Sequence, residues 1–204
     1  MKQILIAEDY GYVLKNNLCL FQKGPLSQWW GGFKGQNGGF TVGYLELYYL
    51  FTGDNFDVFR YLEKNHSKDQ ITFNCCEQWM MASKAVLFND IESLKNILKE
   101  TSPSKQKDLG RTVSNYDQDL WNENKYNIVL RGNDHKFDQN EQIQDFLRSF
   151  HPFTIFAEAA PWDKVWGIGL GPNDPKALDI RTWEGQNLLG KVIMTLRQIY
   201  DCEQ

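Results

Sequence analysis

The stretch NCCEQWMMASKAVLFND, residues 74–90, combines the pattern of a packed helix with two ionisable side chains. Glu77, Met81, Lys84 and Phe88 follow one another at helical spacing and therefore share one face of the predicted helix over 76–88. Glu77 and Lys84 lie two turns apart, roughly 10 Å along the helix axis. This separation is too large for a direct ion pair, but both side chains could reach one ligand that lies along the helix.

Two interpretations of Lys84 are open at this point. Because bulky apolar residues share its face, we expect the side chain to be half buried, and loss of water would then lower the pKa of its ammonium group. A neutral lysine amine is a nucleophile that attacks carbonyl carbons and forms Schiff bases. In the alternative interpretation, the aliphatic stem packs against the protein while the ammonium group reaches water.

Helical periodicity continues on the C-terminal side of this stretch. Asp90 is a suitable N-cap for the segment that follows it, and Asn140 for a later one. The polar segment 101–108, which contains a proline, is expected to be a linker. The spacing of apolar residues predicts four further helices: 91–98, 120–132, 141–150 and 187–200.

Short apolar runs predict a small β component. They cover residues 3–7 and 18–21 near the N-terminus and residues 153–159 later in the chain. The glycine-rich segment 31–43 is expected to be a loop or hairpin. The chain therefore predicts a predominantly helical α+β fold, organised as one compact domain over residues 1–204.

The composition limits the classes of function. The formal net charge is −4 and no long basic run is present, so extensive non-specific nucleic-acid binding is not expected. Two of the four cysteines are adjacent, no pair of cysteines has zinc-ligand spacing, and the three histidines are scattered, which predicts reduced thiols and no metal site. The apolar run at the N-terminus is too short for a signal sequence or a membrane span. We therefore expect a cytoplasmic protein without a membrane partner.

Three other stretches contain candidate functional residues. In AEAAPWDKVWGIGL, residues 157–170, a strand ends at Glu158 and a loop with Asp163 and Trp166 follows, which is typical either of a functional site or of a surface turn. Asn187 precedes the last helix, whose N-terminus could bind a phosphate or be capped. Arg111 ends the basic segment KQKDLGR and could hold a phosphate, although most exposed charge runs are simply solvated.

The order of these motifs resembles the NADAR family, which includes the YbiA-type proteins. The resemblance covers roughly residues 73–200. It is carried by CEQWMMASKA, LGR, the Trp121–Lys125–Val129 spacing, KFDQN, AEAAPWDKVWGIGL and WEGQNLLGKVIMTLR. It implies a compact α+β fold, in agreement with the expected elements.

The resemblance also implies a function. Family members act as N-glycosidases that cleave the bond between C1 of a ribose and a base or amine nitrogen, without a metal or redox cofactor. One implied substrate class is ADP-ribose attached to guanine in nucleic acid or in free nucleotides. The other is a phosphoribosyl-amine intermediate of riboflavin biosynthesis. A non-catalytic ADP-ribose-binding module is the alternative of a different class.

The resemblance assigns roles to individual residues. Lys84 matches the lysine that forms the Schiff base, Glu77 a glutamate that moves a proton or holds a ribose hydroxyl, and Asp163 a general acid or base. Further residues are implied in substrate binding: Ser27, Trp29, Gln78, Arg111, Trp121, Lys136, Glu158, Trp166, Gly167 and Asn187.

The N-terminal part departs from the family pattern. The family has a serine-asparagine-aromatic stretch there, whereas this chain has LSQWW, residues 26–30, with Gln28 at the asparagine position. The connection from this stretch to Glu77 is also longer than usual. We therefore expect residues 31–70 to contain an insertion that is atypical of the family.

Overall fold

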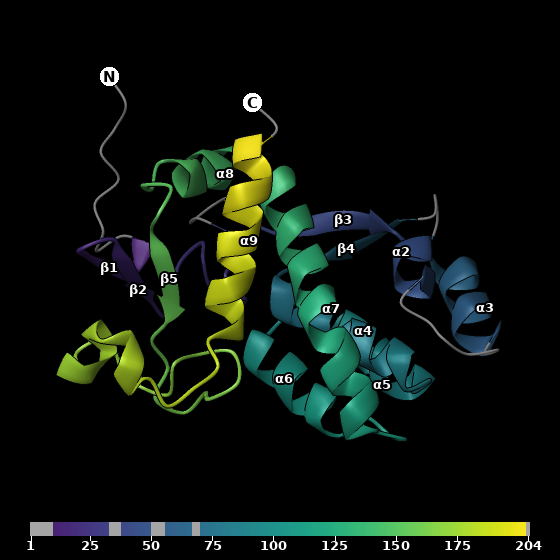
Figure 1. Cartoon of the computed structure of the whole chain (residues 1–204). Coiled ribbons are helices and arrows are strands. Elements are labelled where there is room, and N and C mark those ends of the chain that lie inside the picture. Colours follow the sequence, from purple (N-terminus) through teal and green to yellow (C-terminus); the bar gives the residue numbers. More distant parts are fainter. Residues whose placement is uncertain (1–9, 33–37, 50–55, 67–69, 203–204) are drawn as a thin grey trace. The chain divides into compact units, whose positions relative to one another are not determined.

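The computed structural model describes residues 10–32, 38–49, 56–66 and 70–202. The chain divides into two compact units, each described here by itself (Figure 1). The first unit combines Met1–Trp30 with Asn140–Gln204, and the second is Gly31–Gln139. Whether the chain behaves as the predicted single domain stays a prediction.

The first unit is built on a three-stranded sheet in the order β1-β2-β5. β1 (Tyr12–Lys15) and β2 (Leu18–Phe21) form an antiparallel hairpin, and β2 pairs in parallel with β5 (Ile155–Glu158). Asn16 and Asn17 form the two-residue turn with positive φ angles, as asparagine tolerates in this type of hairpin. The strand prediction at 18–21 is confirmed and that at 153–159 is shortened at both ends, while residues 3–7 lie outside the described residues.

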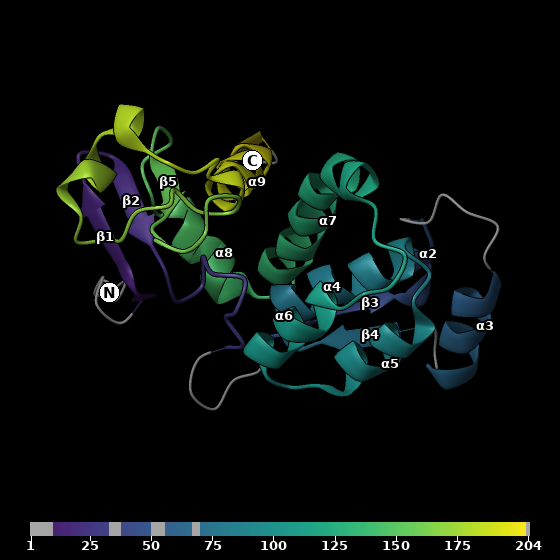
Figure 2. The ribbon, with the colours of Figure 1, turned by 90° about the horizontal axis from the view of Figure 1, so that it is seen from below.

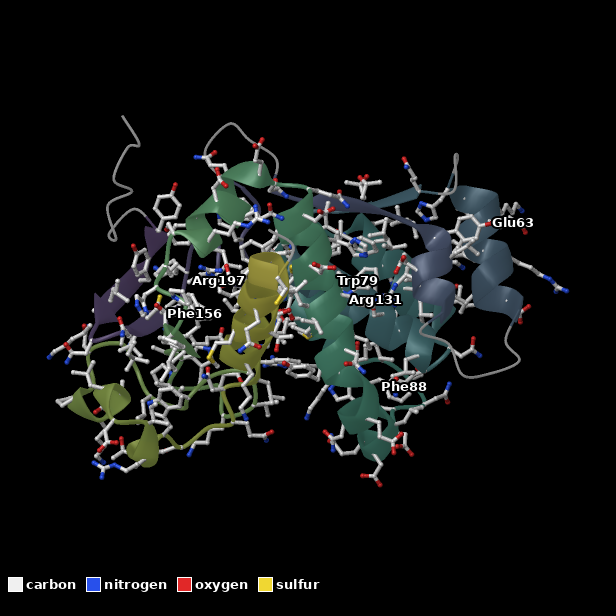
Figure 3. All side chains as sticks on the ribbon, turned by 45° about the horizontal axis from the view of Figure 1, so that its top comes forward. Glu63, Trp79, Phe88, Arg131, Phe156 and Arg197 are labelled. Carbon is white, nitrogen blue, oxygen red and sulfur yellow. The ribbon has the colours of Figure 1, made fainter. Side chains whose placement is uncertain are left out.

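Two helices complete the first unit. α8 (Glu141–Arg148) packs against α9 (Leu188–Cys202), and α9 packs against β5. The predicted helices at these positions are confirmed, and the apolar face of α9 is buried. A Cβ atom at Gly190 would overlap the carbonyl oxygen of Phe156, so this glycine lets α9 approach the strand closely. Phe156 itself is completely buried (Figure 3).

A long loop connects β5 with α9. It contains the short 3-10 helices η2 (Pro175–Leu178) and η3 (Ile180–Thr182). Asp174 and Asp179 precede these helices, and each side chain accepts a hydrogen bond from a backbone N–H two residues later. The loop is thus irregular, as its low periodicity indicates, but held by local hydrogen bonds.

The second unit contains six helices and a two-stranded sheet among its described residues. β3 (Phe40–Gly43) pairs antiparallel with β4 (Gln70–Phe73). The helices are α2 (Tyr44–Tyr49), α3 (Phe56–Asn65), α4 (Cys76–Leu87), α5 (Ile91–Lys99), α6 (Pro103–Arg111) and α7 (Gln118–Asp138). α4 is the central element and packs against α5, α6 and α7 (Figure 2). The segment 31–70 thus contributes β3, α2 and α3.

The prediction of a linker over 101–108 is wrong, because α6 occupies this position. Pro103 is the first residue of the helix, where the missing N–H would have no intrahelical partner and the fixed φ angle suits a helix. Only Gln106 and Gly110 of α6 are buried, so the segment shows little apolar periodicity. Its burial against α4, rather than its own pattern, accounts for the helix.

Helix α7 extends beyond the predicted segment 120–132. It begins at Gln118, after Asp117 whose side chain accepts a hydrogen bond from the N–H of Leu120, and continues to Asp138. Gly132 lies inside the helix, although glycine is more typical of a helix end. A Cβ atom at Gly132 would overlap the ring of Trp79, which is completely buried (Figure 3). Gly132 therefore serves the close packing of α7 on α4.

Among the described residues, no helix combines the length and the apolar character needed to cross a lipid bilayer.

Candidate active site

Helix α4 presents one partly exposed side chain, that of Lys84. The other eleven of its twelve residues are buried, including Glu77 and Gln78 in the first turn. The sequence pattern explains this burial, because α4 must pack against helices on several sides and is apolar on most of its surface. A lysine retained in such a helix is a candidate for a specific role.

The Lys84 amine is held by three groups of the second unit. It donates a hydrogen bond of 2.8 Å to the carbonyl oxygen of Gly110, in the last turn of α6. It also lies 4.3 Å from the ring centroid of Tyr116 and 5.5 Å from that of Trp121, within the range of cation–π contacts. Burial lowers the pKa of Lys84 below its usual 10.5. The three contacts therefore fix the amine, while burial increases its neutral, nucleophilic fraction.

Close packing of α6 on α4 brings the Gly110 carbonyl to Lys84. A Cβ atom at Gly110 would overlap the sulfur of Met81, one turn before Lys84 in α4. The glycine of the LGR motif thus allows the two helices to approach until the amine reaches the carbonyl. This contact is not indicated by the sequence, because the segment has no helical pattern of apolar residues.

Glu77 lies in the first turn of α4, with only 2% of its surface exposed. Burial raises the pKa of the neighbouring Cys76 thiol to about 11; Lys136 acts to lower this pKa and Glu77 to raise it. Lys136 is completely buried in α7, and burial lowers its pKa. The first turn of α4 therefore belongs to a buried polar cluster, distinct from the aromatic surroundings of Lys84 in the same unit.

Gln78 holds the fold around α5 and α6. Its carbonyl oxygen accepts a hydrogen bond of 2.8 Å from the N–H of Asn74, and its amide nitrogen donates to the carbonyls of Ile97, Leu98 and Glu100. These carbonyls lie at the end of α5, where intrahelical donors are missing. A role of Gln78 in substrate binding stays a prediction, and the observed contacts assign its amide to closing this helix end.

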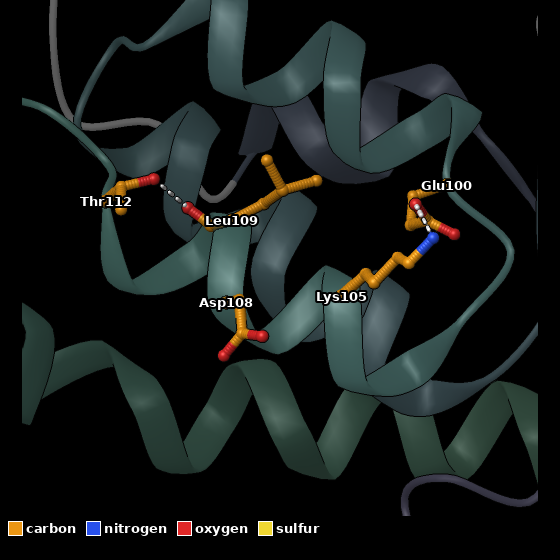
Figure 4. A pocket seen from close by; sticks show the side chains of 5 residues that line it. All are labelled: Glu100, Lys105, Asp108, Leu109 and Thr112. Atoms are coloured by element: carbon orange, nitrogen blue, oxygen red, sulfur yellow. Dashed lines mark hydrogen bonds and ion pairs between the residues drawn. The ribbon is translucent and has the colours of Figure 1, made fainter.

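Arg111 ends α6 and is exposed, and it forms an ion pair of 3.1 Å with Asp108 one turn earlier. Beside it, the outer surface of α6 has an open pocket of about 380 Å³ (Figure 4). The pocket is lined by Glu100, Lys105, Asp108, Leu109 and Thr112. The Lys84 side chain does not line this pocket, so we do not assign the pocket to the candidate active site.

In the first unit, Asp163 organises the loop that follows β5. Its Oδ1 atom accepts hydrogen bonds from the backbone N–H groups of Val165 at 3.0 Å and Trp166 at 2.7 Å. Gly167 follows, and a Cβ atom there would lie 2.8 Å from the carbonyl oxygen of Glu158. The loop therefore folds back onto the end of β5, and the predicted residues Glu158, Asp163, Trp166 and Gly167 lie close together.

Asn187 links this loop to the sheet. Its side chain is buried, donates a hydrogen bond of 2.8 Å to the carbonyl of Phe156 and accepts one of 3.1 Å from the N–H of Glu158. The N–H groups of Leu188 and Leu189 donate to loop carbonyls of Val165 and Trp166. The loop thus supplies acceptors for these N–H groups at the start of α9, and the Asn187 side chain bonds to β5. A role of Asn187 in substrate or phosphate binding stays a prediction.

In the LSQWW stretch, the hydrogen bond observed for Ser27 is local. The Ser27 hydroxyl accepts a hydrogen bond of 3.2 Å from the N–H of Trp29 and is buried. The Trp29 side chain is 45% exposed and is accessible to a ligand. Roles of these two residues in substrate binding stay predictions.

The structure brings Trp121, one of the residues implied in substrate binding, near Lys84. Two other neighbours of Lys84, Tyr116 and Gly110, were not among the candidates from the sequence. Tyr116 lies in the connection between α6 and α7, which has no periodicity. Gly110 contributes through its backbone, which no side-chain pattern indicates. Proximity of Tyr116 to the Asp117 cap was the available signal, because a cap fixes the residues just before a helix.

Comparisons with known proteins identify the family of this chain. Residues 22–200 match the family model of the NADAR domain. The chain is 43% identical over 122 residues to N-glycosidase R617 of Acanthamoeba polyphaga mimivirus, covering 60% of this chain and 71% of the viral protein. It is 38% identical over 144 residues to protein irg-1 of Caenorhabditis elegans, covering 69% of this chain and 68% of that protein.

A solved structure supports the fold. The NMR structure of the E. coli protein YbiA matches with a TM-score of 0.53 and 24% identity, covering 65% of this chain and 70% of that one. The chain therefore has a helical α+β fold of the YbiA type. The chain belongs to the NADAR family.

Proposed function

We propose that this protein is an N-glycosidase that removes ADP-ribose from guanine, in nucleic acid or in free nucleotides, through a Schiff base on Lys84. The surroundings of the Lys84 amine carry the proposal: partial burial, a lowered pKa and a hydrogen bond to the Gly110 carbonyl. Membership of the NADAR family and the name of the viral relative support the class of reaction.

The proposed reaction proceeds in two stages. An acid protonates the ring oxygen or the leaving nitrogen, the neutral Lys84 amine attacks C1, and the C1–N bond breaks so that guanine leaves with a proton. The opened ribose is then joined to Lys84 as an imine. Water adds to the imine carbon, the C–N bond to Lys84 breaks, and the ribose aldehyde and the free amine are restored.

Two carboxylates are the proposed proton carriers. Glu77 stays the candidate in α4 for proton transfer or for holding a ribose hydroxyl, and its burial would strengthen any such contact. Asp163 stays the candidate acid or base, as the family resemblance implies. Its Oδ1 atom is used by the loop, so Oδ2 is the oxygen that we expect to exchange a proton.

The test uses an oligonucleotide that carries ADP-ribosylated guanine. Release of ADP-ribose is followed with and without borohydride, which reduces an imine to a stable amine, and the modified peptide is identified by mass spectrometry. We expect release by the wild type, a trapped adduct on Lys84, and loss of both in Lys84→Met. Retained turnover in that variant would remove the Schiff-base mechanism.

Lys95→Met is the matched control. Lys95 also lies over a tyrosine ring, 5.4 Å from that of Tyr61, but it forms an ion pair with Glu92. Its removal should leave both release and trapping unchanged, which separates the effect of Lys84 from a general loss of lysine charge.

The role of Asp163 requires variants that separate chemistry from folding. Asp163→Asn keeps an oxygen that accepts the two loop hydrogen bonds but removes the acid, whereas Asp163→Ala removes both. We expect the asparagine variant to keep the thermal stability of the wild type and to lose turnover. If the asparagine variant is active, the role of Asp163 is to hold the loop and not to transfer a proton.

Hydrolysis of phosphoribosyl-amine intermediates of riboflavin biosynthesis is the second candidate, favoured by the net charge of −4, which does not attract a long polyanion. The release assay, repeated with a phosphoribosyl-amine intermediate as the substrate, decides between the two candidate functions. Binding of ADP-ribose without release of either product would instead indicate a non-catalytic module.

A further inference from the structure

Tyr116 has the closest aromatic contact with the Lys84 amine. The 4.3 Å between the Lys84 nitrogen and the ring centroid places the amine over the ring face, where the negative electrostatic potential attracts a cation. Trp121 lies farther away, at 5.5 Å. The side chain of Tyr116 is 43% exposed, so hydrophobic burial alone does not explain why an aromatic ring occupies this position.

The connection that carries Tyr116 is tied to the end of α4. The Tyr116 ring packs edge-on against Phe88, with 5.2 Å between centroids and 63° between planes. The preceding residue, Asn115, has a positive φ angle and donates a hydrogen bond of 3.4 Å to the Phe88 carbonyl. The N–H of Ser114 donates to the carboxylate of Asp90, the cap of α5. The ring is therefore fixed relative to the helix that carries Lys84.

We propose that Tyr116 is a positioning residue for Lys84, whose ring face, together with the Gly110 carbonyl, holds the amine in one place and favours its charged form before substrate binds. The proposal rests on the proposed function in one respect, namely that Lys84 is the nucleophile. The ring and burial act in opposite directions on the ammonium group, because a cation–π contact stabilises the charge that loss of water destabilises. Their balance sets the pH at which Lys84 becomes reactive.

The charged groups on the surrounding elements are engaged elsewhere. Asp108 and Arg111 of α6 pair with each other, and Lys125 of α7 donates to Asn122. Asp90 and Asp117 accept backbone hydrogen bonds at the starts of α5 and α7.

Burial first and then Asp117 raise the pKa of the Tyr116 hydroxyl above its usual 10.0, which favours its neutral form. Removal of the Tyr116 ring should therefore change the pKa of Lys84 directly.

The experiment measures Lys84 itself, without substrate. Protein with ¹³C-labelled lysine is titrated by NMR, and the Lys84 signal is assigned by its absence in Lys84→Met. Tyr116→Leu should increase the acid dissociation constant of Lys84 about two- to fivefold, the factor that corresponds to loss of a cation–π contact. Tyr116→Phe keeps the ring and should match the wild type.

Tyr61→Leu is the control, because it removes a similar contact from Lys95 and should leave Lys84 unchanged. If Tyr116→Leu does not fold, Tyr116→Met removes the ring with another flexible apolar side chain and carries the same expectation. An unchanged Lys84 titration in the folded ring-free variant, or an equal change in Tyr116→Phe, would overturn the proposal.

A second measurement separates the inference from the proposed function. In the borohydride assay, Tyr116→Leu should trap less adduct than the wild type at high pH, where Lys84 is neutral in both proteins and only its position differs. If the wild type shows neither release nor trapping, the proposed function fails, while the titration still decides whether Tyr116 controls Lys84. Equal trapping by Tyr116→Leu and the wild type would overturn the positioning role.

Discussion

A methyl group added at Gly132 should destabilise the second unit by about 3 kcal/mol. The new Cβ atom of Gly132→Ala would overlap Trp79, lying 2.8 Å from Nε1 and 3.0 Å from Cγ. Trp79 cannot move away easily, because it is completely buried and its Nε1 donates a hydrogen bond of 2.7 Å to the carbonyl of Ile128, one turn earlier in α7. The methyl group therefore strains both the packing and this hydrogen bond.

The magnitude follows from three contributions. Overpacking of a dense core costs about 1–3 kcal/mol, and loss of a buried hydrogen bond costs about 1–3 kcal/mol. Alanine has a better helix propensity than glycine, which offsets about 1 kcal/mol. A net value near 3 kcal/mol would be a large part of the stability of an ordinary domain, about 5–15 kcal/mol.

Urea unfolding followed by tryptophan fluorescence measures this change. Asn127→Ala, at an exposed position of the same helix, is the control for helix propensity alone and should be neutral or slightly stabilising. If Gly132→Ala were as stable as the control, close packing of α7 on Trp79 would not require the absence of a Cβ atom at position 132. The reasoning about both glycine contacts of α4 would then be wrong.

Three other outcomes are expected. In urea unfolding, the free energy of unfolding of the wild type relative to that of Lys84→Met should rise with pH up to about 10.5. Folding lowers the pKa of Lys84, so between the folded and unfolded pKa values the unfolded chain binds more protons than the folded chain, and stability increases with pH. Asn187→Ala should lower the free energy of unfolding by about 2–4 kcal/mol, because two buried hydrogen bonds to β5 are lost; a change below about 1 kcal/mol would contradict this. Iodoacetamide at pH 8 should modify exposed Cys202 first, and Cys75 and Cys76 only after unfolding, because burial raises the pKa of these thiols to about 12 and about 11. Mass spectrometry of the modified peptides checks the last outcome.

The elements that could be predicted from the sequence are those with strong periodicity and a recognisable cap. α5 follows Asp90, whose side chain accepts the hydrogen bond from Ser93 that the capping pattern indicates. α9 has an apolar stripe that is buried as expected. α6 lacks such a stripe, so its helical structure depends on packing against α4, which local sequence does not encode.

The candidate site could be predicted in part for a related reason. Lys84 stood out because a charged residue interrupts an apolar helix, and the family resemblance added a role. Its other contacts depend on where α6 ends and on the positive φ angle of Asn115 before Tyr116, which are consequences of the tertiary fold. No spacing rule along the chain brings a backbone carbonyl and a loop tyrosine to the same amine.

The polar residues shared with the family motifs therefore differ in the physical reason for their presence. Gln78 and Asn187 are buried, and their amides bond to the backbone, where replacement would leave unsatisfied groups in the interior. The Lys84 amine bonds to the backbone carbonyl of Gly110, and the residue keeps part of its surface exposed. A structural lysine at this position would gain little, since an apolar side chain would pack in α4 without loss of hydration. The cost of holding an amine there is understandable if the amine reacts, and this argument distinguishes Lys84 from the other polar residues of the motifs.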